Sequence, residues 1–149
     1  MERPDIFLFT DGAASGNPGP GGYGTILKCG ELTKELSGGF SRTTNNRMEL
    51  LAVIKGLEAV KWQNARIQIF SDSTYVVKTV TENWKRRKNP DLWEKFDTLA
   101  RNFRLEFHWI KGHAGHPENE RCDRLAVEAR SQASLPQDEG YEELQNTLL

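Results

Sequence analysis

The chain has 149 residues, of which 37% are hydrophobic and 28% are charged, and its formal net charge at pH 7 is −1. This length suits one domain with a substantial buried core. The sequence contains no run of about 18 apolar residues, the length needed to cross a membrane. The charge balance excludes a broadly basic nucleic-acid coat but allows a local basic groove. Two cysteines are too few for a disulfide framework, and the N-terminal segment lacks the pattern of a signal peptide. A soluble, cytoplasmic protein is therefore expected.

Three strands are predicted in the first part of the chain. Residues 5–10 (DIFLFT) form an apolar run typical of a buried strand, and the Gly- and Pro-rich segment DGAASGNPGPGGYG after it predicts a loop. Residues 23–28 and 32–40 are predicted to form two further strands, joined by a short turn. Strands connected so closely pair antiparallel.

Helices and strands alternate in the rest of the chain. A first helix is predicted from an apolar stripe at helical spacing, formed by Leu50, Val53, Ile54 and Leu57. Residues 66–70 (RIQIF) and 105–110 (LEFHWI) predict strands, and further helices are expected after Asp72, from Pro90 and from Pro117.

The predicted order is thus βββαβααβα, an α/β fold. Its mixed five-stranded sheet combines three antiparallel strands with two parallel ones and is flanked by helices. Residues 1–133 are expected to form this domain. Residues 134–149 are polar and lack a clear period, so a loosely held tail is predicted there.

Four acidic residues are candidates for one site. Asp11 and Asp72 each follow a predicted strand, and ligands gather beyond the carboxyl ends of parallel strands. Glu49 and Asp123 border apolar stripes of predicted helices; singly, each of the four has an ordinary explanation as a turn, cap or solvated residue. Together, their repulsion would require cations, and carboxylate oxygens suit Mg²⁺ or Mn²⁺. Such a cluster is typical of two-metal phosphoryl chemistry.

Residues 111–123, KGHAGHPENERCD, allow a different metal site. His113, His116 and Cys122 would be its zinc ligands. A closed zinc site needs a fourth ligand, and the sequence has no C-x-x-C knuckle to supply one, which disfavours this alternative.

Four segments closely resemble type 1 ribonuclease H of the bacterial kind: FTDGAASGNPGPGGYG, TTNNRMELLAVIKGLEAV, IFSDSTYVV and WIKGHAGHPENERCDRLA. The resemblance covers residues 5–129. It implies the ribonuclease H-like fold and a monomeric endonuclease that cleaves the RNA strand of RNA–DNA hybrids without sequence preference. It also implies two metal ions, Mg²⁺ or possibly Mn²⁺, products with 5′-phosphate and 3′-hydroxyl ends, and roles in removing RNA primers and hybrid loops.

The resemblance also assigns catalytic roles. Asp11 would bridge both ions, Asp123 would hold the ion that activates water, and Glu49 and Asp72 would serve the ion at the leaving oxygen. His113 corresponds to a mobile proton carrier, and its loop is flanked by glycines.

Substrate contacts follow from the same resemblance. Contacts to the minor groove are expected from Gly12, Ala13, Asn45, Asn46 and Thr74, and contacts to a DNA-strand phosphate from Asn17, Arg42 and Thr44. Glu120 would support the RNA 2′-hydroxyls. Trp84, beside the basic run at residues 85–88, would bind the hybrid. Bacterial members often carry a longer, lysine-rich helix and loop in this region, called the basic handle, and this segment is shortened here.

Two alternatives share the fold. One is a domain that has lost catalysis and only binds, against which stand the four acids and His113. The other is a different nuclease, such as a transposase or junction resolvase, which the segments TTNNRMEL and KGHAGHPENERCD disfavour.

Overall fold

The computed structural model describes residues 3–147. Its elements in chain order are β1 (Ile6–Ala14), β2 (Gly19–Cys29), β3 (Leu32–Thr43), α1 (Asn45–Glu58), β4 (Arg66–Ser71), α2 (Thr74–Thr81), α3 (Pro90–Ala100), β5 (Arg104–Trp109), α4 (Pro117–Arg130) and α5 (Glu139–Thr147). The predicted order βββαβααβα is confirmed, and α5 follows as an unpredicted helix. Within these residues, no helix combines the length and apolar character needed to span a membrane.

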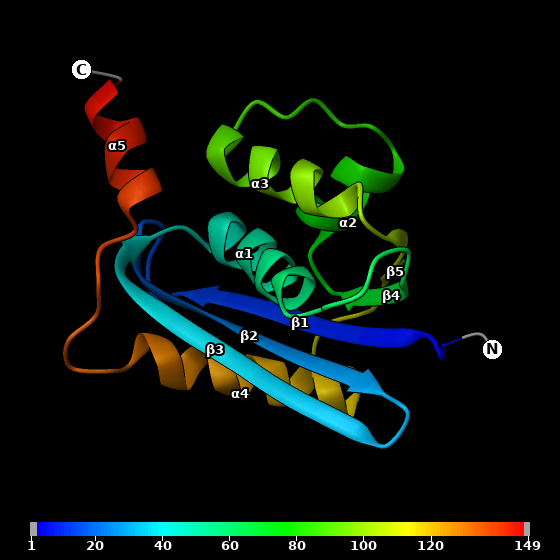
Figure 1. Ribbon diagram of the computed structural model, residues 1–149. Coiled ribbons are helices and arrows are strands. Elements are labelled where there is room, and N and C mark those ends of the chain that lie inside the picture. The colour runs from blue at the N-terminus through cyan, green and yellow to red at the C-terminus, as the bar shows by residue number, and fades with distance from the viewer. Residues whose placement is uncertain (1–2, 148–149) are drawn as a thin grey trace.

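The five strands form one mixed sheet in the order β3-β2-β1-β4-β5. β2 pairs antiparallel with β1 and β3, and β4 pairs parallel with β1 and β5, which confirms the predicted sheet. α1 and α3 lie on one side of the sheet and α4 on the other (Figure 1). Thr10 of β1 is the partner of Ser71 in β4, so Asp11 and Asp72, which follow them, come to the same edge of the sheet.

The hairpin between β1 and β2 is longer than predicted. β1 continues to Ala14, which pairs with Gly21, so the predicted loop over DGAASGNPGPGGYG is wrong except at residues 15–18. Pairing and packing override the low strand propensity of glycine here. A Cβ on Gly12 would collide with the backbone of Met48 and Glu49, so this glycine lets the start of α1 approach β1 closely.

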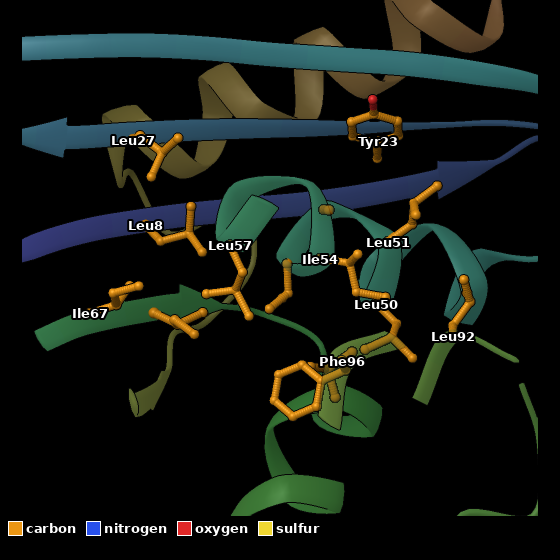
Figure 2. Close-up of a cluster of buried hydrophobic side chains, with 14 of the residues drawn as sticks. Leu8, Tyr23, Leu27, Leu50, Leu51, Ile54, Leu57, Ile67, Leu92 and Phe96 are labelled. Atoms are coloured by element: carbon orange, nitrogen blue, oxygen red, sulfur yellow. The ribbon is translucent and has the colours of Figure 1, made fainter. Parts of the chain in front are cut away.

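The main core lies between the sheet and the helices α1 and α3. Figure 2 shows its central side chains, which are Leu8 and Ile67 from the sheet, Leu50, Ile54 and Leu57 from α1, and Leu92 and Phe96 from α3. The predicted stripe of α1 is buried throughout. Each large apolar side chain buried in this way contributes about 1.5–3 kcal/mol, so the position of α1 is strongly fixed.

Two glycines of β2 let α4 pack directly against the other face of the sheet. A Cβ on Gly24 would collide with the carbonyl oxygen of Cys122, and one on Gly22 with that of Ala126. The helix backbone therefore contacts the strand backbone without side chains between them. This contact sets how far Asp123 stands from the sheet.

The prediction of a loosely held tail is wrong for the part of residues 134–149 that the structure describes. Asp138 is buried, and its carboxylate accepts hydrogen bonds from the Arg47 side chain at 2.8 and 3.0 Å and from the Thr43 hydroxyl at 2.6 Å. It also accepts one from the backbone N–H of Tyr141 at 3.1 Å. α5 is therefore attached to the domain by the buried, charged Asp138 as well as by the Tyr141 ring. Residues 148–149 lie outside the described part of the chain. The predicted end of the domain at residue 133 stays a prediction.

Candidate active site

Three acidic side chains converge at the edge of the sheet where β1 and β4 run in parallel. Asp11 lies within β1, Glu49 in the second turn of α1, and Asp72 directly after β4. One carboxylate oxygen from each lies within 4.8 Å of the other two. The backbone N–H of Gly12 donates to both Asp11 and Glu49, at 3.0 Å each, and so fixes these two carboxylates relative to one another.

These acids line a cavity of about 490 Å³, called here the acidic cavity. Its lining residues are Asp11, Gly12, Ala13, Asn45, Asn46, Glu49, Asp72, Ser73, Thr74, Tyr75, His113 and Asp123. Asp123 thus reaches the cavity from α4, but in the described part of the chain the convergent group comprises only the other three acids. The structure therefore brings three of the four predicted ligands together and places the fourth in the same cavity.

The negative charges of the cluster are poorly compensated. Burial, together with the charge of Asp72, raises the pKa of Asp11 from its usual 3.8 to about 8. Burial, followed by the charges of Asp11 and Asp72, raises the pKa of Glu49 well above its ordinary value, and burial also raises that of Asp72. Desolvated carboxylates in contact favour protonation unless a cation shares them.

A divalent cation fits this donor set. Glu49 Oε2 is buried and has no hydrogen-bond partner in the part of the chain that the structure describes, which is costly for a carboxylate oxygen unless an ion binds it. The donors are all hard carboxylate oxygens, which suit Mg²⁺ or Mn²⁺ better than zinc. Among the His, Cys, Asp and Glu side chains of residues 3–147, the group close enough to share one ion is Asp11, Glu49 and Asp72.

The alternative zinc site is wrong. His113 and His116 are exposed, whereas Cys122 is fully buried, and its thiol donates to the Phe9 carbonyl at 3.2 Å. Burial raises the pKa of the Cys122 thiol, which disfavours the thiolate that zinc requires. His116 instead lies at the N-terminal boundary of α4.

The loop that carries His113 touches the acid cluster directly. His113 has a left-handed backbone, with φ of 56°, and lines the acidic cavity from an exposed position. A Cβ on Gly112 would come to 2.7 Å from Asp72 Oδ2, so the backbone of this loop lies directly against the Asp72 carboxylate. The loop therefore places the exposed His113 beside the carboxylates of the acidic cavity.

Comparison with known proteins identifies the family. A ribonuclease H family model matches residues 3–131. A ribonuclease H of Rippkaea orientalis is 50% identical over 151 residues, covering 92% of each chain. The chain belongs to the ribonuclease H family. It is therefore an enzyme of that family, as its resemblance to type 1 ribonuclease H predicted.

Solved ribonucleases H share the fold. The N-terminal ribonuclease H domain of a Mycobacterium tuberculosis protein is 32% identical with a TM-score of 0.73, and the match covers 85% of this chain and 99% of that domain. LC11-RNase H1, solved in complex with an RNA/DNA hybrid, is 30% identical with a TM-score of 0.67, covering 87% of this chain and 99% of the other.

The candidate substrate residues of this ribonuclease H fall into three groups. The expected minor-groove residues all line the acidic cavity; they are Gly12, Ala13, Asn45, Asn46 and Thr74. Asn17 and Thr44 line a second groove beside it, and Thr44 also caps α1 by accepting from the Arg47 N–H at 3.3 Å. Arg42, Trp84 and Glu120 line neither hollow.

Two residues of the acidic cavity were not predicted from the sequence. Ser73 caps α2 through its hydroxyl, which accepts from the Val76 N–H at 3.1 Å, and Tyr75 donates a hydrogen bond to the carbonyl of Lys88 at 3.5 Å. Both lie within three residues of Asp72. Proximity in sequence to a predicted ligand was therefore the signal that could have found them.

The basic run has no helix or strand of its own. Residues 82–89 connect α2 to α3 irregularly, and the Trp84 side chain is 46% exposed. Arg86 is exposed, but its guanidinium is held by pairing with Asp97 and lies 4.5 Å from the Trp93 ring centre. This short connection agrees with the reduced handle expected from the sequence.

Proposed function

We propose that the protein is an endonuclease that hydrolyses the RNA strand of RNA–DNA hybrids, using two divalent cations, Mg²⁺ or Mn²⁺. The observation that carries the proposal is the convergence of three carboxylates, two buried and one half-buried, within 4.8 Å, in a cavity bordered by amide and hydroxyl groups. The solved relative with a bound RNA/DNA hybrid supports the substrate class. Cleavage without sequence preference is expected from the resemblance to type 1 ribonuclease H, and contacts to sugar and phosphate groups carry no direct sequence information.

The acids would hold the ions in distinct ways. Asp11, at the centre of the cluster, would bridge both ions. Asp123 would hold the ion on the water side, and Glu49 and Asp72 the ion on the leaving-group side. The ions would supply a hydroxide nucleophile and stabilise the 3′-oxygen that leaves, which gives 5′-phosphate and 3′-hydroxyl ends. His113 would carry a proton between the site and solvent.

The groups around the ions would position the RNA strand. Asn45 accepts a hydrogen bond from the Ala14 N–H at 3.3 Å, which orients its amide at the rim of the acidic cavity. Asn46 and Thr74 present further polar groups there, suited to RNA 2′-hydroxyls in a shallow minor groove. Glu120 would support the contacts to the RNA 2′-hydroxyls, and Trp84 would bind the hybrid; neither residue lines the cavity.

The deciding experiment is incubation of an end-labelled RNA–DNA hybrid with the protein and Mg²⁺. The wild type is expected to cut the RNA strand only, and Asp72→Asn to reduce the rate by about a thousandfold or more, because a ligand of the ions is lost. Glu94→Gln, which neutralises an exposed acid outside the cavity, serves as the control and should cleave normally.

Each alternative outcome has a clear meaning. A wild type that binds the hybrid without cutting it would favour a domain that has lost catalysis. Cleavage of duplex DNA at a similar rate would favour another nuclease of this fold. We further propose that the protein acts as a cytoplasmic monomer in removing RNA primers and hybrid loops, and size-exclusion chromatography tests the monomer.

A further inference from the structure

A second hollow, called here the α5 groove, lies beside the acidic cavity and has a volume of about 520 Å³. It is lined by Asn17, Pro18, Thr44, Asn46, Arg87, Lys88, Asn89, Pro90, Tyr141, Leu144 and Gln145. Three of these residues come from α5, a helix for which the sequence predicted no role. The inference below rests on the proposed hybrid nuclease and concerns what α5 adds to it.

α5 is held rigidly enough to form a binding surface. Asp138, at its start, forms a buried ion pair with Arg47, whose side chain is also paired with Asp91 at 2.8 Å. A Cβ on Gly140 would collide with the Asp91 carboxylate, so the helix lies in close contact with this network. Although burial disfavours its charge, the hydrogen bonds from Arg47 lower the pKa of Asp91, so the pair stays ionised.

The α5 groove is continuous with the acidic cavity. Asn46 lines both. Asn17 accepts a hydrogen bond from the Asn45 N–H at 3.0 Å, and the Asn45 side chain in turn accepts from Ala14, so the rims of the two hollows are hydrogen-bonded to each other. The two hollows therefore adjoin one another on the surface.

The groove offers the groups that a sugar–phosphate chain needs. Arg87 and Lys88 are exposed cations at one side, and the side chains of Asn17, Thr44 and Gln145 offer hydrogen bonds to phosphate oxygens. Between them lie apolar surfaces, contributed by Pro18, Pro90 and Leu144. Apolar surface suits deoxyribose, whereas a ribose 2′-hydroxyl buried there would lose its hydrogen bonds to water.

We propose that α5 forms one wall of a binding groove for the DNA strand, in which Gln145 contacts a phosphate next to the one bound at Thr44. Glu142 of the same helix lies 3.8 Å from Arg42, whose guanidinium is also 5.6 Å from the Tyr141 ring centre. α5 thereby holds Arg42, an expected phosphate ligand that does not itself line the groove.

A charge placed inside or outside the groove tests this assignment. Gln145→Glu places a negative charge on the groove wall, and Asn146→Asp places the same charge one residue along, at an exposed position outside it. Affinity is measured by fluorescence anisotropy with a labelled hybrid in Ca²⁺. Gln145→Glu should raise Kd about three- to tenfold through repulsion of phosphate, and Asn146→Asp by less than about twofold because solvent screens it.

A second measurement identifies the strand. A single methylphosphonate, which removes one phosphate charge, is moved along either strand of the hybrid. At one DNA-strand position it should weaken wild-type binding and abolish the difference between the wild type and Gln145→Glu. Loss of that difference only with RNA-strand substitutions, or equal effects of Gln145→Glu and Asn146→Asp, would overturn the proposal.

Failure of this inference differs from failure of the proposed function. Cleavage should be unchanged in Asn146→Asp, whose position lies outside both hollows, whereas Gln145→Glu should require more hybrid to reach the same rate. Unchanged binding with intact cleavage would refute the groove alone, whereas absence of cleavage by the wild type would refute the nuclease. Thermal unfolding of both variants checks that α5 remains docked.

Discussion

Asp11→Asn removes one of three negative charges that converge in the acidic cavity, and it should change activity and stability in opposite directions. Cleavage should fall by about a thousandfold or more, because Asp11 is the proposed bridging ligand. In metal-free buffer the fold should become more stable, because the remaining carboxylates lose a like-charged neighbour. Asn keeps an oxygen that can accept the hydrogen bond from Gly12.

The size of the stabilisation follows from the geometry. Two unit charges 4.8 Å apart repel by about 3.5 kcal/mol at an effective dielectric constant of about 20. Partial protonation and the hydrogen bonds from Gly12 reduce this repulsion, which leaves about 1–3 kcal/mol. For a domain of this size, that corresponds to a rise in Tm of about 3–9 °C.

The effect should depend on pH with a defined sign. The pKa of Asp11 is raised to about 8 in the folded protein, above its unfolded value, so the unfolded chain releases this proton first as pH rises. The wild type therefore loses stability progressively from about pH 4 to pH 8, and the advantage of the variant should be small at pH 5 and largest at pH 9.

Calorimetry of the wild type and Asp11→Asn in EDTA at pH 5, 7 and 9 measures this advantage, with Glu94→Gln, at an exposed position outside the cavity, as control. Adding Mg²⁺ should stabilise the wild type and reduce the difference, since only the wild type has the full ligand set. A Tm for Asp11→Asn at or below that of the wild type at pH 9, or a difference independent of pH, would refute the argument from repulsion.

Three further predictions concern single side chains. Arg47→Met leaves two carboxylates without their buried partner and should cost about 3–5 kcal/mol in urea unfolding, with amide exchange in α5 accelerated more than in α4. Thr44→Ala and Ser73→Ala each remove a helix N-cap, and each should lower the free energy of unfolding by about 1 kcal/mol. Only Thr44→Ala should also weaken hybrid binding, and equal losses of binding in the two variants would contradict the phosphate contact of Thr44. His113→Ala should lower kcat about a hundredfold, consistent with lost proton transfer, while the Kd for the hybrid stays within about twofold; a change confined to Kd would instead make His113 a binding residue.

Local sequence patterns were sufficient where local physics determines the structure. The stripe of α1 and the run RIQIF of β4 specified a helix and a strand because burial of one face requires that spacing. Asp72 at the end of β4 followed from the rule that parallel strands present their carboxyl ends to ligands. Glu49 required the resemblance, since a helix glutamate is ordinarily exposed.

Long-range interactions account for what the sequence did not reveal. α5 is anchored by the pair between Arg47 and Asp138, which are 91 residues apart, and no periodic pattern records such a contact. The extended hairpin from Gly12 onward depends on the close approach of α1, which only the folded chain shows. Likewise, Asp123 was correctly expected near the site, but its distance from the other acids depends on how closely α4 packs.

If Asp123 holds one of the proposed ions, that packing would give the glycines of β2 an influence on metal affinity. Any side chain at Gly24 would push the α4 backbone outward at Cys122, the residue next to Asp123, and so withdraw the fourth acid from the cavity. Substitutions at Gly24 would then reduce activity at limiting Mg²⁺ and be rescued by excess cation, while the three convergent acids remain in place. In a genetic screen, substitutions at Gly24 would have the same phenotype as loss of a metal ligand, although Gly24 has no side chain and contacts α4 rather than the acidic cavity.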